Sequence, residues 1–356
     1  MRRTPARLLA VLAGVVAVLA LAGPAVAHVG GDVAGSDFDG RITSVTPEVP
    51  GVTVRLLQFG DELEVVTTSG TEVEVPGYSD EPYLRIGPDG VWRNSRSPAT
   101  YLNLDRYGRA GVPDTADVAA EPEWVQVSTE PRYVWHDHRT HWMSEGQLPP
   151  QVAADPDSAH LISAWVVPMT VGGAPVEVAG ELTWEPPPSP WVVWPVHLAV
   201  AAVALAAGLL ARDARPLGGL LLVGGAAALV HALTTPEPPE SISSHGGAIA
   251  SALLPALAAV LVAVLGARAA RRGRGAMAGL FALVLGWLLL VQGLPDVDVM
   301  WSAHVLAAGP DLLARVAVAL LLGLGVGLVP GGIAAVRRFR EPAAARPAGP
   351  LRDQVT

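Results

Sequence analysis

The sequence predicts an all-β extracytoplasmic domain, folded as one or two immunoglobulin-like antiparallel sandwiches, followed by an α-helical membrane domain of about five transmembrane helices. Hydrophobic residues make up 51% of the 356 residues, which is high for a single soluble domain. Beyond an apolar N-terminal segment, long Ala, Leu, Val and Gly runs are confined to residues 191–336. Residues 40–185 instead alternate between apolar and polar. One part of the chain is therefore expected to fold in water and the other in the lipid bilayer.

Residues 1–27 are predicted to be a cleaved signal peptide. Arginines at the start are followed by an apolar core and then by the small-residue sequence Ala25-Val26-Ala27. Cleavage after Ala27 would make His28 the first residue of the mature chain.

Residues 28–184 are predicted to form the β domain. Short segments such as "VTVRLL", "LEVVTT" and "PVEVAGELTW" alternate as half-buried strands do. The pairs Asp89-Gly90 and Gly172-Gly173 suit tight hairpin turns. Residues 185–190 are rich in proline and are predicted to be a stiff linker to the membrane.

Residues 191–336 contain five segments long enough to cross a bilayer, for which about 20 residues suffice. They are expected near 191–211, 216–234, 247–267, 276–295 and 311–333. Arginines follow the first, third and fifth segments, whereas the other two loops have no basic residue. The positive-inside rule then predicts a multi-pass plasma-membrane protein with its β domain outside. Residues 337–356 are expected to be a disordered cytoplasmic tail.

Composition excludes several kinds of chemistry. Cysteine is absent, which rules out disulfides, thiolate metal ligands and cysteine nucleophiles. Residues 28–190 carry 9 arginines against 25 carboxylates, which argues against a nucleic-acid partner. This acidity suits the collection of cations and equally serves solubility. No phosphate-binding loop or nucleophile motif is present, and we expect no enzymatic activity.

The segment "YVWHDHRTHWMSEG" at residues 133–146 is the strongest candidate site. His136 and His138 are two residues apart and would share one face of a strand, and His141 follows within reach. Imidazole binds copper and zinc, and the thioether of Met143 favours Cu(I). Asp137 would point the other way, leaving Glu145 or a backbone carbonyl to orient a ring. A surface of structural histidines is the alternative, whereas a hydrolase motif is disfavoured by Thr140, which takes its acidic position.

Further candidate ligands lie near the outer side of the membrane. A free His28 would offer an amine and an imidazole to the same ion. A candidate relay at the membrane surface consists of His197, His231, His245, Met300 and His304. Met300 and His304 are four apart and would share a face if helical. Asp311 and Arg315 are also four apart, so we expect a local ion pair with Asp311 as N-cap.

The layout resembles bacterial copper-handling proteins of the CopC and CopD type. His28 directly after the signal peptide, the cysteine-free β domain and "ITSVTPEVPG" are similar to CopC, and a helical part with outer histidines is similar to CopD. The pattern including "EPYLRIGPDGVWRN" and "WHDHRTHWM" is closer to a family of exported actinobacterial membrane proteins. The resemblance implies copper capture or delivery, with zinc as the alternative ion. The implied partners are membrane lipid and other envelope or copper-handling proteins. A non-enzymatic envelope protein that binds a protein partner is the competing hypothesis.

Overall fold

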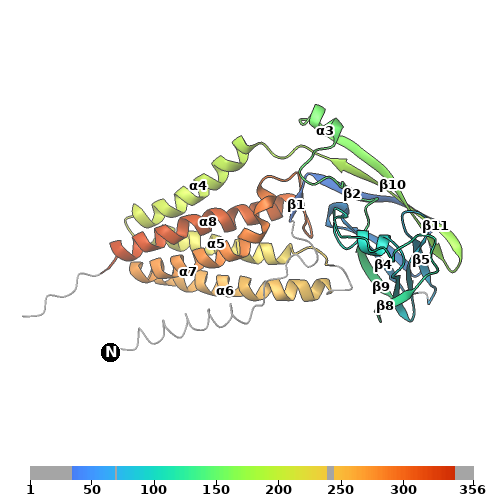
Figure 1. The fold of residues 1–356 in the computed structure, drawn as a ribbon. Helices are drawn as coiled ribbons and strands as arrows, with labels where there is room; N and C mark the ends of the chain where they lie inside the picture. The colour runs from blue at the N-terminus through green and yellow to red at the C-terminus, as the bar shows by residue number, and fades with distance from the viewer. Residues whose placement is uncertain (1–33, 69, 239–243, 341–356) are drawn as a thin grey trace, which may run out of the picture.

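The computed structural model describes residues 34–68, 70–238 and 244–340. The predicted signal peptide, His28 and residues 341–356 of the predicted tail lie outside these ranges. Within them, an antiparallel β domain is followed by a bundle of five long apolar helices (Figure 1). The predicted fold class is thus confirmed.

The β domain consists of two antiparallel sheets. The larger sheet has seven strands in the order β2-β11-β10-β5-β6-β7-β8, and the smaller has three in the order β3-β4-β9. Their bounds are β2 Phe38–Thr46, β3 Val52–Leu57, β4 Glu62–Thr67, β5 Val73–Pro76, β6 Pro82–Gly87, β7 Gly90–Asn94, β8 Trp124–Ser128, β9 Arg132–His136, β10 His160–Val171 and β11 Ala174–Trp184. Three one-turn helices lie between strands: η1 Gln58–Gly60, α2 Ala99–Leu102 and α3 Pro150–Ala154.

Alternation of side chains explains how the two sheets pack. Inward-facing apolar residues of both sheets form one core, which includes Leu63 and Trp135 of the smaller sheet and Ile86 of the larger. The β10–β11 hairpin turns at Gly172 and Gly173, whose positive φ angles of 59° and 81° suit glycine. The sheets have seven and three strands, rather than the four and three of an immunoglobulin constant-type sandwich.

Five helices make up the membrane domain: α4 Pro190–Leu209, α5 Arg215–Leu233, α6 His245–Arg271, α7 Gly275–Gly293 and α8 Asp311–Arg338. Small residues let them approach closely. A Cβ on Gly208 of α4 would lie 2.0 Å from the carbonyl oxygen of Gly331 in α8. Apolar side chains such as Leu257, Trp287 and Val291 face outward, as contact with lipid requires. Helix α8 extends two residues into the segment predicted as tail.

The arginine-bearing ends of the helices meet at the end of the bundle away from the β domain. Arg338 at the end of α8 donates to the carbonyl of Leu209 at the end of α4. Phe339 packs against Gly275, where α7 begins. The opposite end carries tryptophans, with the rings of Trp194 and Trp301 centred 6.4 Å apart. Arginine and tryptophan side chains are both typical of the membrane–water interface.

A short ribbon joins the β domain to the bundle. Strand β1 (Gly35–Ser36) pairs antiparallel with β12 (His304–Val305), which follows the 3-10 helix η2 (Leu294–Met300). Asp298 accepts hydrogen bonds from the backbone N–H groups of Ala34 and Gly35, at 2.9 and 3.0 Å. The start of the β domain is therefore attached to the loop between α7 and α8.

Two local expectations for this loop are wrong. Pro310, not Asp311, is the N-cap of α8. Arg315 donates to the backbone carbonyls of Val299, at 2.9 Å, and Ala303, so its interaction with Asp311 is a charge attraction and not a direct ion pair. The guanidinium of Arg315 is therefore directed at η2 and at the loop that follows it.

Candidate functional site

The histidine segment forms a tight turn after β9, built around the fully buried side chain of Asp137. This carboxylate accepts the indole N–H of Trp135 at 2.9 Å and two guanidinium N–H groups of Arg139 at 2.8 and 2.7 Å. The hydroxyl of Thr140 is also buried and lies 2.6 Å from the carbonyl oxygen of Gly60. Asp137 and Thr140 hold the turn together, and neither side chain is exposed to bind an ion.

The surroundings of Asp137 stabilise its ionised form. Burial by itself would raise the pKa of this carboxyl, but hydrogen bonds and the positive charge of Arg139 hold its pKa below the usual range. Asp137 thus stays ionised and keeps Arg139 in place.

Each of the three histidines in the turn has one ring nitrogen directed at a backbone carbonyl. The pairs are His136 Nδ1 with Asp61 O at 3.2 Å, His138 Nε2 with Asp105 O at 3.0 Å, and His141 Nδ1 with Trp142 O at 3.3 Å. A carbonyl only accepts, so these nitrogens carry the proton and the other ring nitrogen keeps its lone pair. Metal-binding histidines are oriented in this way. Glu145, the other predicted partner, pairs with Arg109.

Two of the imidazoles and the methionine lie near one another. The ring centres of His138 and His141 are 5.6 Å apart. A Cβ on Gly108 would lie 3.0 Å from Cε1 of His138 and 3.5 Å from Cε of Met143, so both side chains border this glycine. Nε2 of His141 is buried without a hydrogen-bond partner. Over the described ranges, no group of three His, Asp or Glu side chains is arranged to hold one ion.

Burial keeps two of these rings neutral. It lowers the pKa of His141 to about 4, and it also lowers the pKa of His136. Neutral imidazole is the form that binds metal. Both rings are therefore uncharged at neutral pH.

Two buried acids beside the turn were not predicted from the sequence. Burial raises the pKa of Asp61 to about 6 and that of Glu62 to about 7. Asp61 contacts Arg106 at 2.7 Å and lies 3.9 Å from Nδ1 of His141, and Glu62 pairs with His136 across β4 and β9. Asp61 and Glu62 are far from the histidines in the sequence, and the pairing of β4 with β9 brings them close. The residues around the histidines do not reveal this pairing.

The candidate relay residues do not form one site. Nε2 of His231 lies 3.1 Å from a carboxylate oxygen of Asp296, whereas His245 is hydrogen-bonded to Thr235 O. His304 lies 3.9 Å from Glu185. His197 is bonded to the carbonyl of Val193 in its own helix, at 2.8 Å.

The expected helical face shared by Met300 and His304 is absent from the described loop. Met300 ends η2 and packs in an apolar cluster, and His304 begins β12. The two side chains therefore belong to different elements.

Comparison with known proteins gives no relative. No family profile matches the sequence, and neither a curated protein nor a solved structure matches the chain. The resemblance to CopC and CopD gains no support from these comparisons.

Proposed function

We propose that this chain is a membrane-anchored, extracytoplasmic metal-binding protein that captures or delivers copper through the turn at residues 136–143. The observation that carries the proposal is the common orientation of the three imidazoles. Each gives its N–H to a backbone carbonyl and retains a second nitrogen able to bind an ion.

His138 and His141 are the proposed first ligands. Two imidazoles bound to one ion through bonds of about 2.0 Å have ring centres about 5 to 6 Å apart. The observed 5.6 Å lies within this range. Their available nitrogens are Nδ1 of His138 and Nε2 of His141, because the other nitrogen of each ring faces a carbonyl.

Met143 distinguishes copper from zinc in this proposal. Its methyl group borders Gly108 together with the His138 ring. Two imidazoles and a thioether make a soft ligand set that suits Cu(I), whereas zinc would need a harder fourth ligand or water. His136 flanks the pair and is a further ligand if the turn adjusts.

Several earlier expectations belong to the same proposal. The arginines at the helix ends away from the β domain support an outer location of the turn. His28 stays a proposed ligand. Ala34, the first described residue, lies at the junction with the bundle, where Asp298 accepts its N–H.

The test is a Cu(I) titration of the full chain in nanodiscs against a chromophoric chelator. The double variant His138→Ala/His141→Ala should weaken binding by at least about 100-fold, since loss of a mere orienting partner already costs 10- to 100-fold. His160→Ala is the matched control, because His160 also faces a carbonyl, that of Asp155 at 2.6 Å, outside the turn. Equal affinities of the two variants would refute the proposal.

A Met143→Leu variant tests the choice of ion. Leucine has similar volume but no sulfur. Cu(I) affinity should fall while Zn²⁺ affinity stays unchanged. An equal effect on both ions would argue against a thioether ligand.

A second candidate function, the binding of a protein partner, is favoured by strand β8. This strand lies at the edge of the seven-stranded sheet, carries no charge and exposes Val125 and Val127. Uncharged edges of this kind accept a strand from another chain. A photocrosslinker at Val127 should then capture a partner in cells, whereas one at Glu177, an exposed residue of β11 with paired strands on both sides, should not.

A further inference from the structure

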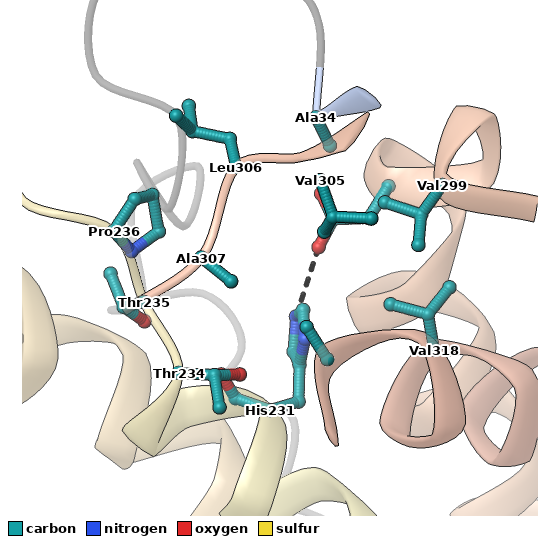
Figure 2. A pocket seen from close by; sticks show the side chains of 12 residues that line it. Ala34, His231, Thr234, Thr235, Pro236, Val299, Val305, Leu306, Ala307 and Val318 are labelled. Carbon is teal, nitrogen blue, oxygen red and sulfur yellow. Dashed lines mark hydrogen bonds and ion pairs between the residues drawn. The ribbon is translucent and has the colours of Figure 1, made fainter. Parts of the chain in front are cut away.

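A small cavity lies where the β domain meets the bundle, at the C-terminal end of α5 (Figure 2). Its volume is about 20 Å³, enough for one water molecule or one ion. The walls come from the end of α5, from η2, from the segment after β12 and from α8, with Ala34 of the β domain also in contact. The cavity thus lies within the bundle end and its loops, and the β domain contributes Ala34 to its wall.

One polar pair stands out in this mostly apolar lining. Nε2 of His231 in α5 lies 3.1 Å from Oδ2 of Asp296 in η2. The dashed line at His231 in Figure 2 marks this contact. The side chains are 16% and 4% exposed. Ionisable residues at such positions are costly, and in membrane proteins they mark ion or proton sites more often than structural contacts.

The electric field at the cavity favours a cation. The C-terminal end of α5, at Leu233, carries the negative end of the helix dipole. Asp296 adds a carboxylate, and the adjacent Arg315 is engaged with two backbone carbonyls and does not line the cavity. Thr234 and Thr235 are the other lining residues with side-chain oxygens.

We propose that this cavity is a second metal site, at which His231 and Asp296 bind a single divalent transition-metal ion. Bonds of about 2.0 Å to nitrogen and 2.1 Å to oxygen at a tetrahedral angle place the two ligand atoms about 3.3 Å apart. The observed separation of 3.1 Å is close to this value, and binding of the ion releases the proton that the imidazole and the carboxylate share in the metal-free pair. An imidazole ligand selects a transition metal over Ca²⁺ or Mg²⁺.

This site is separate from the turn at residues 136–143. It uses different elements, and its two protein ligands are an imidazole and a carboxylate with no sulfur, which suits Zn²⁺ or Cu²⁺ and not Cu(I). Because Ala34 lines the cavity and is held by Asp298 of the same loop, a bound ion would also stabilise the junction.

The test counts bound Zn²⁺ per chain after equilibrium dialysis of the full protein in nanodiscs. Asp296→Asn is the main variant, because asparagine keeps the size of the side chain and an oxygen near His231. It should weaken one binding event at least tenfold, and His231→Gln should do the same. His245→Gln is the matched control, since His245 lies at the same end of the bundle but does not line the cavity.

Combination with His138→Ala/His141→Ala separates the two proposals. If both sites bind Zn²⁺, each set of substitutions removes one equivalent and the combined variant binds none. If only the junction site binds, Asp296→Asn alone abolishes binding and the turn variant has no effect. Unchanged stoichiometry and affinity in Asp296→Asn and His231→Gln, with normal thermal unfolding, would overturn the junction site whatever the turn variant does.

Discussion

The substitution Asp137→Asn tests whether this residue organises the histidine turn. The structure makes Asp137 the buried acceptor of three side-chain N–H groups, one from Trp135 and two from Arg139. Asparagine keeps the shape and one acceptor oxygen but removes the charge opposite Arg139, whose side chain is only 20% exposed.

Removal of one partner from a buried ion pair lowers the free energy of unfolding by about 3 to 5 kcal/mol. Because Arg139 is partly exposed and asparagine still accepts one hydrogen bond, we expect a loss of stability at the lower end of this range, about 3 kcal/mol. At about 1.4 kcal/mol per factor of ten, amide hydrogen exchange over residues 133–146 should accelerate about 100-fold. The measurement is hydrogen–deuterium exchange with mass spectrometry on the full chain in nanodiscs.

Glu145→Gln is the matched control for this prediction. It removes the same charge from the same segment and breaks an arginine pair of 2.5 Å, but these side chains are 59% and 60% exposed. Such a pair contributes about 0 to 1 kcal/mol, so exchange should change less than about fivefold. Similar exchange in the two variants would refute the organising role of Asp137.

Three further predictions concern the acids, the bundle and the junction. The pKa of Glu62 rises from 4.5 to about 7 on folding, so the folded chain binds more protons in this interval and stability falls as pH rises through it. Glu62→Gln should remove this pH-dependent loss of stability, so the variant should have a higher unfolding temperature than the wild type at pH 8. The difference in unfolding temperature between variant and wild type should be smaller at pH 4.5. The same difference at both pH values would contradict the prediction. In the bundle, Gly208→Ala should lower the thermal stability, because its Cβ would meet the Gly331 carbonyl at 2.0 Å, whereas Gly219→Ala, with nothing within 4 Å, should not. At the junction, Asp298→Ala removes the acceptor of two backbone N–H groups and should increase exchange at residues 34–36 by about tenfold or more, and unchanged exchange would contradict the contact.

The helix and strand pattern was determined by the sequence alone. The five helices and the ten strands of the β domain lie close to the predicted segments because the signal is local: about 20 consecutive apolar residues for a membrane helix, and alternation with turn residues for a strand. The same local reasoning failed in the loop before α8. There, spacing by four suggested a shared helical face for Met300 and His304, but His304 lies in a strand. Asp311 and Arg315 do lie one turn apart in α8, yet the guanidinium donates to backbone carbonyls instead of forming a direct ion pair.

The composition of both candidate sites was decided by the tertiary structure. The sequence identified the histidines of the turn, but only the pairing of β4 with β9 places Glu62 opposite His136, and only the fold supplies the carbonyls that orient the three rings. Likewise, His231 was visible as a polar residue in an apolar helix and Asp296 as an acidic residue of an outer loop. Only the tertiary structure, in which η2 packs against α8, brings the two side chains into contact. Contacts between distant segments depend on strand register and helix packing, which result from the burial of the whole core and leave little trace in the few residues around each ligand.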